Sequence, residues 1–134
     1  MYKFSVIVAC YNSKEKLSQT IESVINQDIK EVQIIIIDGG STDNSNEIFN
    51  KFKNNINILI SEKDYGIADA WNKGLKYVEG EFVNFLNAGD FYEENILGRI
   101  YTNCIKFKTN FIGYGNTIQA IQKMVSSKAK LKTN

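Results

Sequence analysis

Three polar loops carry the residues of this chain that could do chemistry. Residues 38–43 (Asp-Gly-Gly-Ser-Thr-Asp) follow a run of four isoleucines, residues 61–74 combine acids, amides and glycines, and residues 86–90 are Leu-Asn-Ala-Gly-Asp. Each loop stands where a strand is expected to lead into a helix, and open α/β sheets bind their ligands at that edge. The pattern predicts a site for a charged, sugar-like or nucleotide ligand.

Two carboxylates in these loops are candidates for direct contact with a ligand. Asp38 follows the isoleucine run, so its carboxylate is expected at the rim of the sheet, where it can accept hydrogen bonds from a base or a ribose hydroxyl. Asp90 follows Gly89, and a lone carboxylate there suits a hard divalent cation that keeps most of its waters and bridges to phosphates. These are also ordinary turn residues, and the alternative role in a turn or helix cap is favoured for Asp43.

The loop at residues 61–74 leads into a helix with two distinct faces. Asp69, Asn72 and Lys73 are spaced i, i+3 and i+4, which places them on one face at the start of the helix. The residues expected to pack form the other face: Ile67, Ala70, Trp71, Leu75 and Val78. The polar face can therefore reach a ligand, and the alternative is a solvated ion pair between Asp69 and Lys73.

The elements that would position these loops alternate along the chain. Strands are expected at residues 4–10, 32–37, 56–60 and 82–86, with a weak fifth at 111–114. Helices are expected after Ser13, which can cap the first, and at residues 44–52, 67–80 and 96–107. This alternation predicts an α/β fold with a doubly wound, mostly parallel sheet and helices on both faces.

Composition excludes several classes of site. The 134 residues are 43% hydrophobic, which suits one globular domain, and the absence of histidine excludes Ser-His or Cys-His nucleophiles and histidine-ligated metals. Cys10 and Cys104 lack partners at metal-ligand spacing, so we expect two buried free thiols. No apolar run approaches the roughly 18 residues that a membrane span needs, and no signal peptide is evident, so a cytoplasmic location is expected.

Other nucleotide-binding folds do not match the first loop. Residues 9–13 contain no glycine, so this loop is neither the glycine-rich turn of dinucleotide-binding proteins nor a P-loop. A receiver domain would need an acidic cluster after the first strand, where this chain has Tyr11 and Asn12.

With these motifs assembled, the chain resembles the family 2, GT-A type nucleotide-sugar glycosyltransferases, especially the bacterial subgroup of polysaccharide biosynthesis. Residues 5–12 resemble the first strand and Tyr-Asn loop of the family, residues 37–43 its nucleotide-binding turn, and residues 61–74 with 86–90 its sugar- and metal-binding half. The resemblance spans residues 4 to about 117. It implies a GT-A fold and inverting transfer from a UDP-, GDP- or dTDP-linked sugar to a glycan or lipid-linked acceptor, with no nucleic acid partner.

The resemblance also implies roles for individual residues. Tyr11, Asn12 and Asp38 would contact the base and ribose, and Asp64, Asp69, Asn72 and Lys73 would border the diphosphate and sugar. Further donor-binding positions are Gly39, Gly66 and Asn87. Asp90 would hold Mg²⁺ or Mn²⁺, as one carboxylate where the family usually has two or three.

The C-terminal part of the chain departs from the family pattern. A donor-binding domain is expected at residues 1–117 and a basic tail at 118–134, with the acceptor half and catalytic base beyond the chain end. Residues 95–134 contain seven Lys or Arg and no acid. The alternatives are a non-catalytic nucleotide-sugar binding fragment, or an α/β interaction domain whose basic tail docks on a partner. The basic tail could also contact the anionic inner face of the membrane, although a disordered end is the favoured interpretation.

Overall fold

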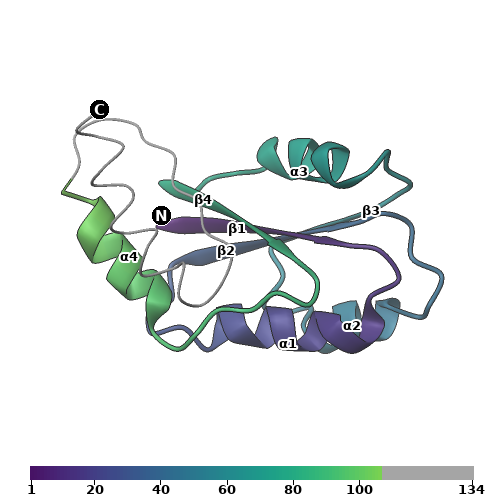
Figure 1. Cartoon of the computed structure of the whole chain (residues 1–134), viewed down its shortest axis with the longest axis horizontal. Helices are drawn as coiled ribbons and strands as arrows, with labels where there is room; N and C mark the ends of the chain where they lie inside the picture. The colour runs from purple at the N-terminus through teal and green to yellow at the C-terminus, as the bar shows by residue number, and fades with distance from the viewer. Residues whose placement is uncertain (107–134) are drawn as a thin grey trace. The chain divides into compact units, whose positions relative to one another are not determined.

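The structure, a computed structural model, describes residues 1–106 of the chain, which divide into two compact units. The first unit comprises Met1–Asn26 and Lys30–Phe91 and contains the sheet (Figure 1). Its elements are β1 (Phe4–Cys10), α1 (Lys14–Ile25), β2 (Val32–Asp38), α2 (Asn46–Lys51), β3 (Ile58–Ser61), α3 (Ile67–Leu75) and β4 (Phe82–Asn87). The second unit combines Gln27–Ile29 with the residues from Tyr92 onward, and its described part contains α4 (Ile96–Cys104).

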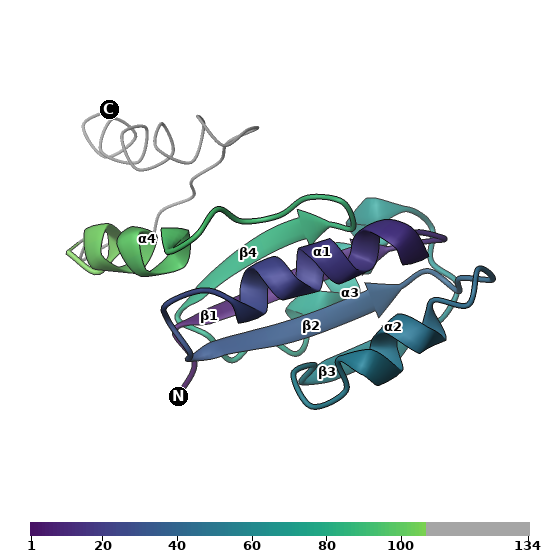
Figure 2. The same cartoon turned by 90° about the horizontal axis from the view of Figure 1, so that it is seen from below.

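The four strands form one parallel sheet in the order β3-β2-β1-β4. Helices α1 and α2 cover one face of the sheet and α3 covers the other (Figures 1 and 2). The predicted α/β architecture is therefore confirmed. Because the chain proceeds from β1 to β2 on one side and reaches β4 on the other, the carboxyl ends of β1 and β4 flank a topological switch point, where open α/β sheets bind ligands.

Burial of both sheet faces accounts for the apolar strands. All seven residues of β1 are buried, and the α3 face of the sheet has a core of Ile7, Ala9, Ile35 and Ile37 with Ala70 of the helix. On the opposite face, the buried side chains of α1 are Leu17, Thr20, Ile21 and Val24. The two cysteines are buried free thiols, as the sequence predicts.

Helix α3 approaches the sheet more closely than its sequence pattern suggests. Its buried residues are Ala70 and Gly74, and a Cβ at Gly74 would lie 2.5 Å from Ile7 Cγ2. Ile67 and Leu75, which were expected to pack, are 46% and 45% exposed. Because Ala70 and Gly74 are small, the axis of α3 lies close to β1. The larger side chains of Ile67 and Leu75 therefore remain partly exposed to solvent.

Element ends differ from the predicted ends by a few residues. Strand β3 begins at Ile58 rather than at residue 56. The reason is that Ile34 N–H donates to the Asn57 side-chain Oδ1 (2.7 Å), in place of a main-chain carbonyl, while Asn57 N–H donates to the Ile34 carbonyl (2.9 Å). Helix α2 begins after Asn44, whose φ of 63° is left-handed. Helix α3 ends at Leu75 and not near Gly80, and the fourth helix is described to Cys104. The expected strand at 111–114 and the tail lie outside the described residues.

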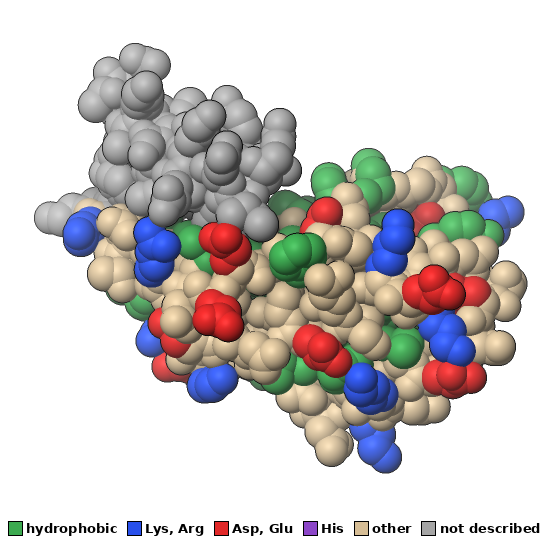
Figure 3. All heavy atoms as spheres, turned by 60° about the horizontal axis from the view of Figure 1, so that its bottom comes forward, with side chains coloured by type: hydrophobic (Ala, Val, Ile, Leu, Met, Phe, Trp, Pro, Cys, Tyr) green, Lys and Arg blue, Asp and Glu red, His purple; other side chains and the backbone are tan. Residues whose placement is uncertain are grey.

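Charged side chains of both signs are interspersed on the face of the described residues that Figure 3 shows. In Figure 3, which turns the lower side of Figure 1 forward, acidic and basic groups alternate among neutral ones. Ion pairs join α1 to α2 through Lys14 and Glu47 (2.7 Å) and through Glu22 and Lys51 (3.2 Å). Exposed pairs of this kind contribute about 0–1 kcal/mol each. Among the described residues, no helix combines the length and apolarity needed to cross a bilayer.

Candidate functional site

A cavity of about 330 Å³ opens at the carboxyl ends of β1 and β4. Its lining comes from the loop after β1, the start of α3 and the end of β4, and includes Cys10, Tyr11, Asp64, Gly66, Ile67 and Asn87. This volume lies at the lower end of the range of small-molecule sites. Of the three polar loops predicted to converge, those at residues 61–74 and 86–90 line the cavity, whereas residues 38–43 are not part of the lining and the loop after β1 takes their place.

Asp38 points into the protein and accepts hydrogen bonds from four groups. Its Oδ1 accepts the Ser41 hydroxyl and, at 3.7 Å, the Cys10 thiol, while its Oδ2 accepts Ser41 N–H (3.0 Å) and the Ser61 hydroxyl (2.6 Å). The residue is only 2% exposed. The expectation that this carboxylate emerges at the rim is wrong, because Cys10 at the end of β1, Ser61 at the end of β3 and Ser41 in the following turn all donate to it. Its acceptor positions are occupied by the protein.

The thiol of Cys10 is a hydrogen-bond donor and not a nucleophile. Burial raises its pKa far above the ordinary value, and the neighbouring Asp38 carboxylate raises it further. The thiol therefore stays protonated at neutral pH, and a protonated thiol is a poor nucleophile. Cys10 also lines the cavity, where its protonated thiol is an uncharged part of the lining.

The loop after β1 braces the loop after β2. The N–H of Asn12 donates to Ser41 Oγ (2.9 Å), and the N–H of Thr42 donates to Asn12 Oδ1 (2.8 Å). Asn12 adopts a φ of 47°, which asparagine tolerates better than most residues. The Asn12 side chain is thus engaged with the neighbouring loop, while Tyr11 is 61% exposed and lines the cavity, where its ring can stack on a ligand.

Asp43 caps a helix, but the helix is α1 and not the one that follows it. Its Oδ2 accepts Lys14 N–H (2.9 Å) in the first turn of α1, and its Oδ1 accepts the Ser45 hydroxyl. Ser13 occupies the expected N-cap position, yet its hydroxyl donates to the Tyr11 carbonyl and makes no capping bond. Asp43 thereby ties α1 to the loop after β2.

This cap predicts a pH dependence of stability. The hydrogen bonds from the Ser45 hydroxyl and Lys14 N–H lower the pKa of Asp43 in the folded protein. A group whose pKa is lowered on folding stabilises the fold above its unfolded-state pKa, near pH 4, and loses that contribution as the pH falls through its folded-state value. We expect Asp43→Asn to lower the melting temperature at pH 7 and to narrow its gap to wild type as the pH falls below about 4. A gap that is unchanged from pH 7 to pH 2.5 would contradict this role.

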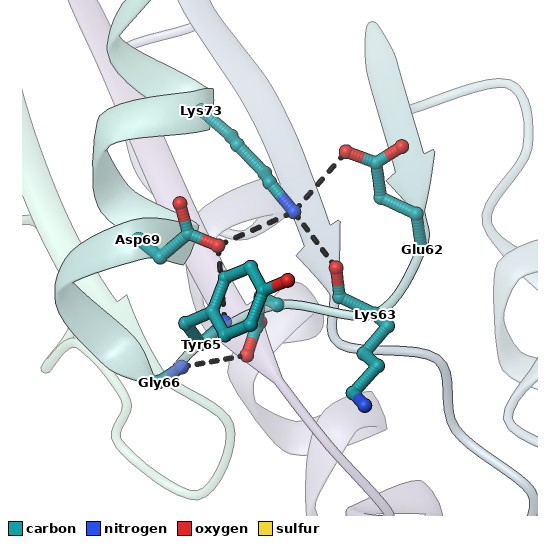
Figure 4. A network of polar contacts seen from close by, with 7 residues as sticks. Glu62, Lys63, Tyr65, Gly66, Asp69 and Lys73 are labelled. Atoms are coloured by element: carbon teal, nitrogen blue, oxygen red, sulfur yellow. Dashed lines mark hydrogen bonds and ion pairs between the residues drawn. The ribbon is translucent and has the colours of Figure 1, made fainter.

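Lys73 ties the loop after β3 to helix α3 (Figure 4). Its Nζ lies 3.1 Å from Glu62 Oε1 and 3.4 Å from Asp69 Oδ2, and it donates to the Lys63 carbonyl at 3.0 Å. Asp69 also accepts Tyr65 N–H (3.0 Å), which is the main reason that its pKa is lowered. The ion pair between Asp69 and Lys73 that the sequence left as an alternative is thus formed. Both residues shape the loop, and Asn72 is exposed.

Asp64 lies on this loop and faces both the cavity and Gly39. Its Oδ1 accepts Gly66 N–H at 3.0 Å. A Cβ built on Gly39 would lie 2.8 Å from Asp64 Oδ2, so the carboxylate occupies the space beside the Cα of this glycine. Gly66 has a φ of 108°, which favours glycine at the turn into α3. The carboxylate of Asp64 is half-buried and lines the cavity.

The end of β4 holds Asp90 at the protein surface. Asp90 Oδ2 accepts Asn87 N–H (3.3 Å), and Asp90 N–H donates to the Asn87 carbonyl (2.9 Å). Within residues 1–106, no three acidic, cysteine or histidine side chains converge on a point that could hold a metal. A cation here would therefore take one protein carboxylate and complete its shell with water and ligand oxygens, a coordination typical of Mg²⁺.

The sequence missed some residues that build the site. Cys10, Ser13, Ile67 and Ala88 line the cavity beside the predicted residues. Cys10 and Ala88 are placed next to strand ends, which is the signal that could have identified them. Ser61, which holds Asp38, could have been identified only from the pairing register, since it pairs with Asp38 across β2 and β3.

The comparison with known protein families gives one match across most of the chain. Residues 5–120 match the model described as glycosyl transferase family 2. The chain is 34% identical over 100 residues to glycosyltransferase GlyG of Streptococcus pneumoniae, which covers 72% of this chain and 33% of that protein. It is 37% identical over 102 residues to the cholesterol galactosyltransferase of Borreliella burgdorferi, covering 75% of this chain and 28% of that protein. The chain thus spans about a third of the length of these relatives.

Solved structures share the fold. Staphylococcus aureus TarS 1–349 in complex with UDP-GlcNAc matches with a TM-score of 0.71 and 25% identity, covering 84% of this chain and 37% of that one. The mannosyltransferase PcManGT of Pyrobaculum calidifontis, in complex with GDP-Man and Mn²⁺, matches with a TM-score of 0.72 over 95% of this chain and 40% of that one. At 18% identity this second match concerns the fold alone.

Proposed function

This chain belongs to glycosyl transferase family 2, and from that premise we propose that its cavity binds a nucleotide-diphosphate sugar together with a divalent cation. The observation that carries the proposal is the position of the cavity at the switch point, where an exposed aromatic ring, Tyr11, and a carboxylate, Asp64, line one opening. The donor would serve inverting transfer to a glycan or lipid-linked acceptor in cell-surface polysaccharide synthesis.

In this proposal, different residues near the cavity contact different parts of the donor. Tyr11 would stack on the base, and Asp64 and Asn87 would bind polar groups of the donor within the cavity. Asp90, which is exposed and accepts a hydrogen bond from Asn87 N–H beside the cavity lining, would hold Mg²⁺ or Mn²⁺. When bound, the cation neutralises the negative charge of the leaving diphosphate. Asp69 and Lys73 act by holding the loop that carries Asp64. Asp38 supports the site indirectly, because its carboxylate accepts hydrogen bonds from Cys10 at the end of β1 and from Ser61 at the end of β3.

A second candidate function is donor binding without transfer. Inverting transfer needs a base within hydrogen-bond reach of the attacking hydroxyl. The family resemblance puts this base after the donor half, and residues 95–134 contain no Asp or Glu. Radiolabelled or mass-detected donor hydrolysis or transfer by the full chain would decide for the enzyme. Nucleotide binding without either reaction would show that this chain by itself binds the donor without transferring it.

Thermal unfolding of the full chain with UDP, GDP or dTDP, each with and without Mn²⁺, tests the donor site. A ligand at about 100 times its dissociation constant stabilises the folded state by roughly 2.7 kcal/mol, which raises the melting temperature by several degrees. We expect such a shift with at least one nucleotide, dependent on Mn²⁺ and lost in Asp90→Asn. Glu31→Gln removes one exposed acid that pairs with Lys3 at the other end of the sheet, so it is the matched control and should keep the shift. Absence of a shift with all three nucleotides would refute the proposal.

A further inference from the structure

We propose that Thr20 of helix α1 is a positioning residue for the cation site: it holds the turn at residues 87–90 so that the Asp90 carboxylate can bind Mg²⁺ or Mn²⁺. The inference rests on the proposed donor site. It extends that site to α1, which covers the opposite face of the sheet from α3 (Figures 1 and 2). Thr20 is not among the residues that line the cavity, so it acts through the turn and not by touching the donor.

The first step concerns the carboxylate that a cation would use. Asp90 is exposed, and its Oδ2 accepts Asn87 N–H at 3.3 Å, whereas its Oδ1 accepts no hydrogen bond from the described residues. Within residues 1–106, no group of three acidic, cysteine or histidine side chains forms a metal site. A cation bound by one carboxylate therefore depends on the backbone that carries this carboxylate, because no other protein ligand fixes its position.

The second step is that the turn has three N–H groups with three different partners. Ala88 N–H donates to a carbonyl of β1 (2.9 Å), and Asp90 N–H donates to a carbonyl within the turn (2.9 Å). Gly89 N–H donates to Thr20 Oγ1 (2.8 Å). Of these three bonds, only the last has a side-chain acceptor. It is therefore the one that a substitution can remove without altering the turn or the strand itself.

The third step is that the packing of α1 does not explain the Thr20 hydroxyl. Thr20 is 0% exposed. The other buried side chains of α1 are apolar: Leu17, Ile21 and Val24. The Thr20 hydroxyl donates to the Lys16 carbonyl (3.4 Å), which leaves the lone pairs of Oγ1 for Gly89 N–H. A valine side chain has nearly the same shape and would fill this place, but it would leave Gly89 N–H without its acceptor.

The fourth step is a second contact between α1 and the same glycine. Gly89 has a φ of 106°, which glycine adopts readily and other residues rarely. The aliphatic stem of Lys16 lies against it, since a Cβ built on Gly89 would be 3.2 Å from Lys16 Cδ. Lys16 and Thr20 are four residues apart, so they project from one face of the helix. Helix α1 thus holds the residue that precedes Asp90, and a shift of Gly89 would move the carboxylate.

Removal of the Thr20 hydroxyl tests the inference through the metal dependence of binding. Calorimetry on the full chain would give the dissociation constants of UDP, GDP and dTDP, each with and without Mn²⁺. For the nucleotide that wild type binds most tightly, the ratio of the two constants measures the contribution of the cation. In Thr20→Val this ratio should fall by about 10-fold, the lower end of the effect of removing a group that orients a metal ligand, or to the value of Asp90→Asn if that is reached first. The dissociation constant without Mn²⁺ should stay at the wild-type value.

Further variants separate positioning from a general loss of stability. Thr20→Ala also removes the hydroxyl and should give the same fall, so either variant that folds provides the test. Thr20→Ser retains the hydroxyl and should retain most of the wild-type ratio. Ser23→Ala removes another hydroxyl of α1, which donates to the Thr20 carbonyl (2.7 Å), and this matched control should keep the ratio. In an Asp90→Asn background, Thr20→Val should cause no further fall, because both substitutions act through one carboxylate.

The outcomes distinguish this inference from the donor site. If wild type binds none of the nucleotides, the proposed function fails and this inference fails with it. If binding is the same with and without Mn²⁺, the cation site and this inference fail while nucleotide binding stands. If the Mn²⁺ dependence is lost in Asp90→Asn but Thr20→Val keeps the wild-type ratio, or if Ser23→Ala lowers the ratio equally, the donor site stands and the role of Thr20 is refuted. A fall in Thr20→Val that Thr20→Ser restores supports it.

Discussion

Asp38→Ala is expected to lower the free energy of unfolding by roughly 3–5 kcal/mol, the range for breaking a buried polar network by removing its centre. The substitution leaves two hydroxyls, an N–H and a thiol without their common acceptor, and it does so where three strand ends meet. Urea unfolding followed by circular dichroism should show a midpoint lower by about 2 M, because the slope for a domain of this size is roughly 1.5–2 kcal/mol/M.

Ser61→Ala provides the matched comparison for Asp38→Ala. It removes one of the four donors and leaves the carboxylate with the other three, so it should cost about 1 kcal/mol. A midpoint for Asp38→Ala that lies as close to wild type as that of Ser61→Ala would show that the four bonds are not cooperative. It would also reopen a direct role of Asp38 in ligand binding.

Gly80→Ala is expected to destabilise the protein by roughly 2–4 kcal/mol through overpacking against main chain. A Cβ at Gly80 would lie 2.5 Å from both the Phe4 carbonyl carbon and the Ser5 nitrogen. Strand β1 cannot yield there, because it pairs with β2 on one side and with β4 on the other. The melting temperature should fall by about 10 °C.

The same substitution disturbs a polar network at the amino ends of the strands. Ser5 Oγ accepts Gly80 N–H (2.8 Å) and donates to Gln33 Oε1 (2.5 Å), and Gln33 Nε2 donates to the Tyr77 carbonyl (3.0 Å). Gly39→Ala serves as the control for stability, since the atom it meets is the end of a flexible side chain. Equal melting temperatures for the two alanine variants would contradict the assigned contact.

The sequence by itself determined the type and order of the elements and the edge at which the loops meet. Apart from Ser5 and Gln33, residues 4–10 and 32–37 are apolar on both sides, as is typical of strands covered by helices on both faces of a parallel sheet, and the observed sheet is parallel. Parallel strands bring their carboxyl ends to one edge. The family resemblance assigned Tyr11, Asp64, Gly66 and Asn87 to one donor site at this edge, and all four line the cavity.

Only the tertiary structure decided what each polar group faces. Asp38 turns inward because Ser61 and Cys10 stand beside it in neighbouring strands, and Asp43 caps α1 because two loops 29 residues apart in sequence lie together. Lys73 holds Glu62 as well as its helical neighbour Asp69, which periodicity along the helix cannot reveal. Apolar periodicity is a local property of the chain, whereas the partner of a carboxylate or ammonium depends on strand register and on how closely small residues such as Gly74 let a helix approach the sheet.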